Sequence, residues 1–213
     1  HPDIKAVSFV GSTKVGTHVY NRATFNGKRA QCMMGAKNHA IVLPDANKQQ
    51  TLNNLLGAAF GAAGQRCMAL PVVILVGEAQ SWLPDLIEKT KGLKVSGGAE
   101  PGTDIGPVVS CSALDRISSL IATGVEQGAT LVLDGRNPEV AGYAQGNFIG
   151  PTIFSDVTTE MAIYREEIFG PVLCVLHADT LNDAIELINA NPNGNGTARF
   201  TRSGAAARHF QEE

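Results

Sequence analysis

The sequence predicts an α/β fold built around a largely parallel β-sheet. Short apolar stretches typical of buried strands, such as 72–76 and 172–176, alternate along the chain with segments that carry the apolar spacing of amphipathic helices. Strands and helices in alternation indicate βαβ units, in which a helix forms the crossover between parallel strands. A stretch rich in Gly, Pro and Asn at 134–151 is expected to be a loop.

The first elements are expected to form a strand–helix–strand unit. Residues 4–10 are apolar enough for a buried strand, and Gly11-Ser12 closes it. A helix should follow, because Ser12 or Thr13 is a good N-cap residue and an apolar stripe continues until Asn26-Gly27. A second strand is expected at 30–34.

The remaining chain continues the alternation. Its clearest helix covers 52–60, where leucines, an alanine and a phenylalanine recur at helical spacing before the small residues Gly61-Ala62-Ala63-Gly64. The other expected strands are 40–43, 72–76, 130–133, 172–176 and 197–201, and the other expected helices are 82–91, 114–127, 181–188 and the segment from Ala205 onward.

Composition excludes several classes of protein. With 213 residues, 44% of them hydrophobic, the chain has enough apolar material for a core, but no apolar run approaches the ~18 residues of a membrane helix. Lys and Arg number 17 against 20 Asp and Glu and are not clustered, so neither nucleic acid nor a membrane is an expected partner. The four cysteines show no CxxC spacing and no Cys/His cluster, so we expect free thiols and no metal site.

Cys67 is the strongest candidate for a catalytic residue. It follows a helix and a Gly-containing turn, and Arg66 beside it would stabilise the thiolate, which is the nucleophilic form. The alternative is a small buried residue, the commonest fate of a free cysteine. Cys174 lies inside an apolar strand and is expected to be buried in the core.

Two further segments are candidates for ligand binding. The turn at Gly11-Ser12 leads from a strand into a helix, whose N-terminus offers unpaired N–H groups to an anion, although it matches neither GxGxxG nor a P-loop. The stretch Glu166-Glu167-Ile168-Phe169-Gly170-Pro171 places carboxylates and an aromatic ring before a buried strand. Each segment alone is equally compatible with an ordinary helix cap or a charged turn.

Together these motifs resemble the aldehyde dehydrogenase superfamily. The resemblance rests on the order and spacing of Phe9-Val10-Gly11-Ser12, Gly35-Ala36-Lys37-Asn38, Gly64-Gln65-Arg66-Cys67 and the 166–171 stretch, and it covers essentially the whole chain. It implies an aldehyde dehydrogenase-like α/β fold, with residues 1–38 as the last part of a Rossmann-like NAD-binding domain. Residues 39–213 would then form most of the catalytic domain.

The resemblance also implies roles for individual residues. Cys67 would be the catalytic nucleophile and Arg66 would bind the substrate. The residues implied in NAD binding are Gly11, Ser12, Gly16, Met34, Glu167 and Phe169. Ser12 would contact the pyrophosphate, Glu167 the nicotinamide ribose and Phe169 the nicotinamide ring, with Met34 as a backbone-level neighbour of that ring.

Within the superfamily the sequence looks like the CoA-acylating branch that oxidises methylmalonate and malonate semialdehydes. Hydrolytic relatives carry a general-base glutamate two residues before the glycine matched by Gly35, and this chain has Met33 there. Water needs a general base to release an acyl group, whereas a thiol with a pKa near ~8.5 is already partly ionised. The resemblance therefore implies coenzyme A as co-substrate, and an arginine beside the nucleophile suits a substrate with a distal carboxylate.

The family pattern implies more than these residues contain. We expect an oxyanion-hole asparagine and an adenosine-binding lysine upstream of His1 and an oligomerisation strand beyond Glu213, so the 213 residues alone are expected to be inactive. The resemblance implies a homotetramer for the full-length protein, in the mitochondrial matrix of a eukaryote or the cytoplasm of a bacterium. No targeting segment is recognised in the chain.

Three other functions are compatible with parts of the sequence. One is a hydrolytic, CoA-independent aldehyde dehydrogenase. Another is a papain-like thiol hydrolase that pairs Cys67 with one of the five histidines, although no motif places a histidine beside it. The third is an inactive, truncated protein with only a structural role.

Overall fold

The computed structural model describes residues 1–213 and divides them into two compact units, 1–36 and 37–213. The sequence analysis placed the domain boundary two residues later, between 38 and 39. None of the helices combines the length and the apolar character that a membrane crossing requires.

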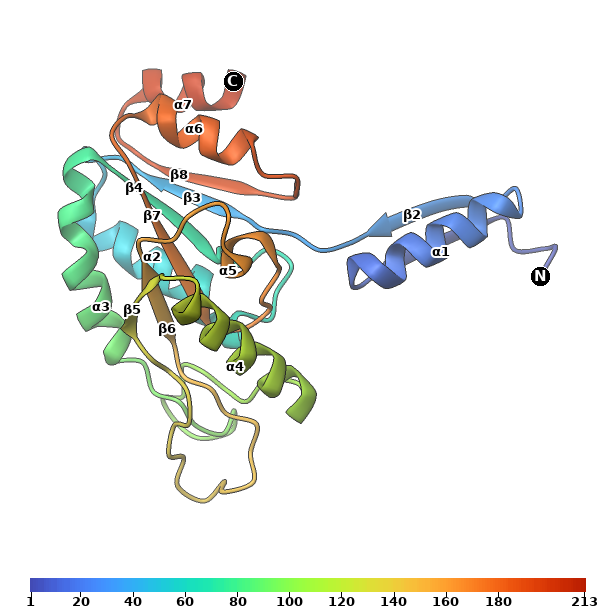
Figure 1. Cartoon of the computed structure of the whole chain (residues 1–213), viewed down its shortest axis with the longest axis horizontal. Helices are drawn as coiled ribbons and strands as arrows, with labels where there is room; N and C mark the ends of the chain where they lie inside the picture. Colours follow the sequence, from blue (N-terminus) through green and yellow to red (C-terminus); the bar gives the residue numbers. More distant parts are fainter. The chain divides into compact units, whose positions relative to one another are not determined.

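The first unit is the expected strand–helix–strand (Figure 1). Strand β1 (Ala6–Val10) and strand β2 (Arg29–Met33) pair in parallel, and helix α1 (Thr13–Phe25) connects them. The N-cap residue of the helix is Ser12, one of the two predicted candidates.

The second unit contains a six-stranded sheet in the order β5-β6-β7-β4-β3-β8. Only the β5–β6 pair is antiparallel, so the predicted, largely parallel sheet is confirmed. The strands are β3 (His39–Val42), β4 (Val72–Val76), β5 (Thr130–Leu133), β6 (Thr152–Ser155), β7 (Val172–Ala178) and β8 (Thr197–Phe200).

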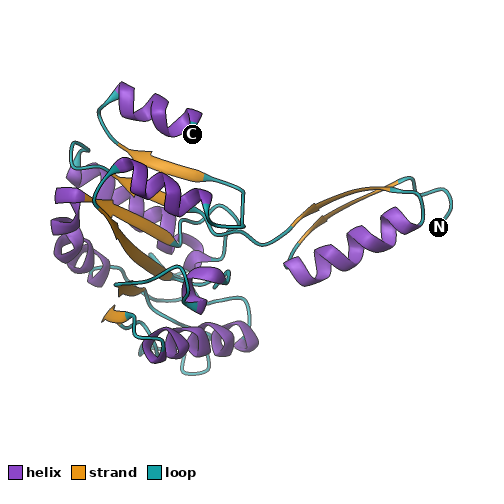
Figure 2. Cartoon of the chain, turned by 45° about the horizontal axis from the view of Figure 1, so that its top comes forward, coloured by secondary structure: helices purple, strands orange, loops and turns teal.

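Helices flank these strands (Figure 2). They are α2 (Lys48–Phe60), α3 (Leu83–Lys91), α4 (Cys111–Glu126), α5 (Ala162–Arg165), α6 (Leu181–Asn189) and α7 (Gly204–Glu212), with short 3₁₀ turns at Gly61–Gly64 and Gly77–Trp82. Every residue of β3 and β4 is buried, which explains why these strands are continuous apolar or nearly apolar runs.

Two elements were not predicted from the sequence. Strand β6 has only four residues. It directly follows the loop at 134–151, and Asp156, whose φ is +56°, follows the strand. Helix α5 is a single turn of four residues. Neither is long enough to show a period of its own, so each depends on the neighbours that it contacts.

A buried histidine connects the sheet to helix α5. His39, the first residue of β3, is 1% exposed, and its Nε2 lies 3.0 Å from the hydroxyl of Tyr164. Burial, together with the nearby Lys37 charge, lowers the pKa of His39 to about 4, against an ordinary value of 6.5. The imidazole is therefore neutral in the folded protein at neutral pH.

We predict that acid destabilises the protein through His39. Between pH 6.5 and about 4 the unfolded chain binds a proton at His39 that the folded chain excludes, so the free energy of unfolding should fall by about 2 to 3 kcal/mol over this range. Urea unfolding at pH 7.5 and pH 4.5 measures the loss. In His39→Gln, which does not titrate, the loss should be smaller by that amount, and an equal pH dependence in both proteins would contradict the prediction.

Candidate functional site

The motifs of the second unit meet at one edge of its sheet. Asn38, the segment 65–71, the segment 166–171 and the pair Asn195-Gly196 each directly precede a strand, namely β3, β4, β7 and β8. These four strands are parallel neighbours, so their amino-terminal ends lie together. Many α/β proteins bind ligands at the carboxyl ends of strands, and this site lies at the opposite edge.

A tight turn brings the chain from helix α2 to Cys67. After α2 ends at Phe60, the residues Ala62, Ala63 and Gly64 adopt φ values of +51°, +53° and +66°, a conformation that non-glycine residues rarely take. The N–H of Ala69 then bonds to the carbonyl of Arg66 at 3.1 Å. The side chain of Cys67 is exposed on this turn, as a nucleophile needs, which argues against the buried-cysteine alternative.

Arg66 contributes to the end of helix α2. Its Nη2 donates to the carbonyl oxygens of Gly57 (2.7 Å) and Ala58 (2.8 Å), which also accept the backbone N–H groups of Gly61 and Leu70. The sequence analysis did not anticipate this role. The predicted contact with substrate stays a prediction, and the Nε and Nη1 groups of Arg66 make no hydrogen bond in the structure.

Asn38 holds the turn that carries Cys67 from inside the molecule. Its side chain is 3% exposed, and its Nδ2 donates to the carbonyl oxygens of Cys67 (2.8 Å) and Ala69 (2.7 Å). Its Oδ1 accepts from the N–H of Gly196 at 3.0 Å. A buried amide with three partners fixes the backbone on both sides of residue 68. No role for Asn38 was predicted beyond its place in the motif Gly35-Ala36-Lys37-Asn38.

Two cationic side chains fix the loop that carries Glu167 and Phe169. The Lys37 ammonium, 1% exposed, donates to the carbonyl oxygens of Ile163 and Glu166, each at 2.7 Å. Arg116 donates to the carbonyl of Glu167 at 3.0 Å and also to that of the next residue. Burial lowers the pKa of Lys37. Glu167 is half-buried, and Phe169 is 37% exposed with a φ of +51°.

The turn that carries Cys67 and this loop are in close backbone contact. A Cβ atom built on Gly64 would lie 2.2 Å from the carbonyl oxygen of Gly170. The next residue, Gln65, accepts a hydrogen bond from the N–H of Val109 at 2.9 Å. The structure thus brings the segments of Cys67 and of Glu167 and Phe169 together, because glycine at 64 lets two backbones approach.

The predicted residues of the first unit gather at the carboxyl ends of β1 and β2. Ser12 is the N-cap residue of α1, but its side chain accepts no hydrogen bond from the helix. The first N–H groups of α1 therefore have no capping partner. A Cβ on Gly16 would lie 2.5 Å from Cγ of Met34, and one on Gly11 would lie 2.6 Å from the Phe9 ring. Both glycines therefore leave room for a neighbouring side chain.

The other cysteines lie outside this arrangement. Cys174 is fully buried in β7, as predicted, and burial raises the pKa of its thiol. Cys111 is exposed at the start of α4 and contacts Asn147 Oδ1 at 3.0 Å. No three His, Cys, Asp or Glu side chains gather in a way that would hold a metal ion.

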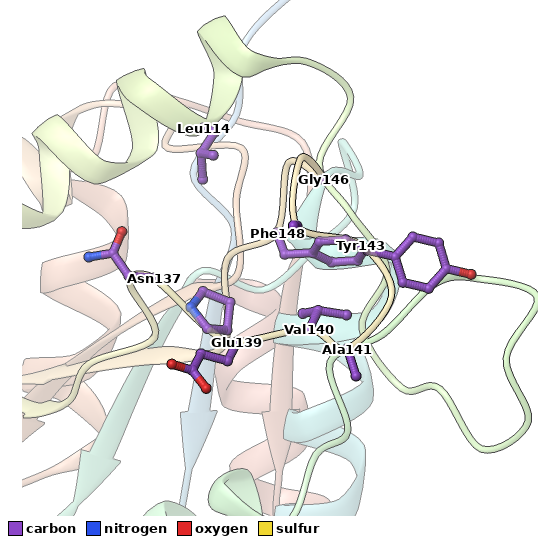
Figure 3. Close-up of a pocket in the computed structure, with 10 residues that line it drawn as sticks. Leu114, Asn137, Glu139, Val140, Ala141, Tyr143, Gly146 and Phe148 are labelled. Carbon is purple, nitrogen blue, oxygen red and sulfur yellow. The ribbon is translucent and has the colours of Figure 1, made fainter.

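A pocket of about 570 Å³ lies elsewhere in the second unit (Figure 3). The loop 137–148 forms nearly all of its wall, and Leu114 of α4 completes it. Tyr143 and Phe148 contact edge to face with ring centroids 5.8 Å apart. None of the predicted site residues lines this pocket, so we do not assign the predicted function to it.

We predict that Gly64→Ala separates the two loops. The new Cβ would overlap the Gly170 carbonyl oxygen, and alanine is strained at φ +66°, so the free energy of unfolding should fall by about 2 to 4 kcal/mol. Gly57→Ala is the control, since a Cβ there meets nothing within 4 Å and helix α2 should gain slightly. Urea unfolding compares the two variants, and an equal effect would contradict the close approach.

Comparison with known proteins agrees with the motifs. The family model described as aldehyde dehydrogenase family matches residues 1–213. The methylmalonate-semialdehyde/malonate-semialdehyde dehydrogenase (acylating), mitochondrial, of Rattus norvegicus is 57% identical over 210 residues, which are 99% of this chain and 39% of the relative.

Two solved structures extend the comparison. The methylmalonate-semialdehyde dehydrogenase of Oceanimonas doudoroffii is 47% identical with a TM-score of 0.95, over 98% of this chain and 43% of that one. The aldehyde dehydrogenase of Mycobacterium tuberculosis complexed with NAD+ is 32% identical with a TM-score of 0.94, over 100% of this chain and 44% of that one.

These findings confirm both the predicted fold and the predicted resemblance to the acylating branch. The chain spans roughly two fifths of the length of the relatives it matches. Its whole length is covered by one family model, and the chain therefore belongs to the aldehyde dehydrogenase family.

Proposed function

We propose that the chain carries the nucleophile of an NAD-dependent, CoA-acylating dehydrogenase that oxidises methylmalonate or malonate semialdehyde. The observation that carries this proposal is the exposed thiol of Cys67 on a turn whose carbonyl groups are bonded to the buried Asn38. The names of the similar proteins support the reaction class.

Cys67 supplies the covalent step. Its thiolate attacks the aldehyde carbon, so a C–S bond forms and the carbonyl electron pair moves onto oxygen. The N–H of Cys67 makes no hydrogen bond within the chain, so it is available to donate to this oxyanion. Such a donor raises the rate because it meets charge that develops only on the way to the adduct.

The residues of the first unit fit a dinucleotide. The uncapped start of the 13-residue helix α1 offers unpaired N–H groups to a pyrophosphate, and the Ser12 hydroxyl is free to join them. Gly11, Gly16 and Met34 would complete this binding surface, with Glu167 contacting the nicotinamide ribose and Phe169 its ring. NAD+, when bound, accepts the hydride from the carbon attached to Cys67, which leaves a thioester on the enzyme.

Release of the acyl group is proposed to use coenzyme A. Met33 stands where hydrolytic relatives carry a base, so nothing at that position can deprotonate water. The CoA thiolate attacks the thioester carbonyl, the bond to Cys67 Sγ breaks, and the thiolate of Cys67 is restored. With either semialdehyde the acyl group loses carbon dioxide before transfer, giving propionyl-CoA or acetyl-CoA.

Arg66 is proposed to bind the distal carboxylate of the substrate. Only its Nη2 is used at the end of helix α2, which leaves the Nε and Nη1 donors for a carboxylate oxygen. Anchoring through Nη2 would also limit the motion of the guanidinium and so reduce the entropy lost on binding.

The rival functions receive less support. None of the five histidines makes a hydrogen bond with Cys67, and His39 is engaged with Tyr164, so the papain-like arrangement lacks its base. A hydrolytic dehydrogenase would need a general base elsewhere in the protein, because Met33 cannot act as one. A homotetramer and a mitochondrial location are further proposals, the latter supported by the names of eukaryotic relatives.

We predict that sustained NADH formation requires CoA. The polypeptide encoded by the complete gene, mixed with methylmalonate semialdehyde and NAD+, should release about one NADH per active site and then stop, because the thioester accumulates. Added CoA should restore steady turnover with propionyl-CoA as product. Sustained NADH and a free acid without CoA would identify the hydrolytic enzyme instead.

We also predict that Cys67→Ser abolishes activity. A serine hydroxyl at this position has no base to activate it, so turnover should fall by roughly a thousandfold or more. Cys111→Ser, which changes the other exposed cysteine, is the matched control and should keep wild-type activity. Unchanged activity of Cys67→Ser would support a purely structural role for the chain.

A further inference from the structure

Asn195 has an unusual backbone conformation close to the nucleophile turn. It lies between two glycines in the loop that connects α6 to β8, and its φ is +145°, which side chains other than glycine rarely adopt. A glycine would meet this conformation without strain. The presence of an asparagine therefore suggests that its side chain has a use that outweighs the strain.

The side chain of Asn195 makes one hydrogen bond, to the nucleophile residue. Its Nδ2 donates to the carbonyl oxygen of Cys67 at 2.8 Å, across 128 positions of sequence. The Nδ2 of Asn38 donates to the same oxygen, also at 2.8 Å. Two amide donors thus occupy both lone pairs of this carbonyl.

The contacts form a closed set. Asn38 bonds to Cys67 on one side, and its Oδ1 accepts from the N–H of Gly196 on the other. Gly196 is the neighbour of Asn195, which returns to Cys67. Because the peptide unit after Cys67 is held from two directions, the direction of the Cα–Cβ bond that carries the thiol is also fixed.

We propose that Asn195 is a positioning residue for the Cys67 nucleophile. Asn38 is buried and holds several backbone groups, so it serves folding as well, whereas Asn195 is exposed and holds only the Cys67 carbonyl. A small displacement of a reacting atom slows attack strongly, so this one contact acts on rate more than on stability. The inference rests on the proposed role of Cys67.

Three variants of the polypeptide encoded by the complete gene test the proposal. Asn195→Gly removes the amide but suits the backbone conformation, and Asn195→Asp replaces the donor by an oxygen that repels the Cys67 carbonyl. Asn193→Asp makes the same charge change two residues earlier, where the side chain has no hydrogen bond, and is the control. We expect the rate of the NADH burst to fall about tenfold in Asn195→Gly and further in Asn195→Asp.

The other measurements separate positioning from folding. KM for NAD+ should stay within twofold and Tm within about 2 °C of wild type in Asn195→Gly, and Asn193→Asp should keep the wild-type burst. A merely structural backbone role predicts the opposite order, with glycine equal to or better than asparagine. A burst in Asn195→Gly as fast as in wild type overturns the proposal.

Alkylation of the thiols tests the contact between Asn195 and Cys67 without dehydrogenase chemistry. With iodoacetamide and peptide mass spectrometry, Asn195→Gly should alkylate Cys67 at least about threefold faster, because the freed turn exposes the thiol in more orientations. Exposed Cys111 should react unchanged, and buried Cys174 should stay unmodified while the protein is folded. An unchanged rate of Cys67 alkylation in Asn195→Gly would overturn the positioning role of Asn195. Failure of the wild-type protein to form NADH would overturn only the proposed function.

Discussion

The hydrogen bonds of the buried Asn38 side chain are the contacts on which the candidate site depends. This amide lies just before β3 and makes hydrogen bonds with the turn before β4 and the loop before β8. One polar side chain thus connects the segments that precede three strands. Such a group is costly to bury without its partners. The turn that carries Cys67 is thereby held by the sheet, although its thiol is exposed to solvent.

The edge of the sheet explains why distant motifs meet. Parallel strands begin at the same edge, so residues that precede β3, β4, β7 and β8 are neighbours whatever their separation in sequence. Lys37 and Asn38, adjacent in the chain, point to the two loops that flank this edge, one fixing the carbonyls near Glu166 and the other those of Cys67. Two neighbouring side chains thus set the positions of the turn that carries Cys67 and of the loop that carries Glu167 and Phe169.

Much of the fold could be predicted because its signals are local. The strands 72–76 and 130–133 have the predicted bounds, and the helix that follows Ser12 begins where its cap indicates. Strand β6 and helix α5 were not predicted, because a segment of four residues is too short to show a helical or strand periodicity of apolar residues. Cys67 was predicted as the nucleophile from its motif, and the structure shows that this residue is exposed. The roles of Asn38 and Asn195 were not predicted, because their partner is a backbone carbonyl far away in sequence that no pattern of residue types reveals.

The most direct test of the central claim is to trap the acyl group on the enzyme. The polypeptide encoded by the complete gene would be mixed with methylmalonate semialdehyde and NAD+ in the absence of CoA, quenched in acid and analysed as peptides by mass spectrometry. A propionyl thioester on the peptide that contains Cys67, lost on addition of CoA, is the predicted result. An unmodified Cys67 after NADH has formed, or an acyl group on another residue, would contradict the account.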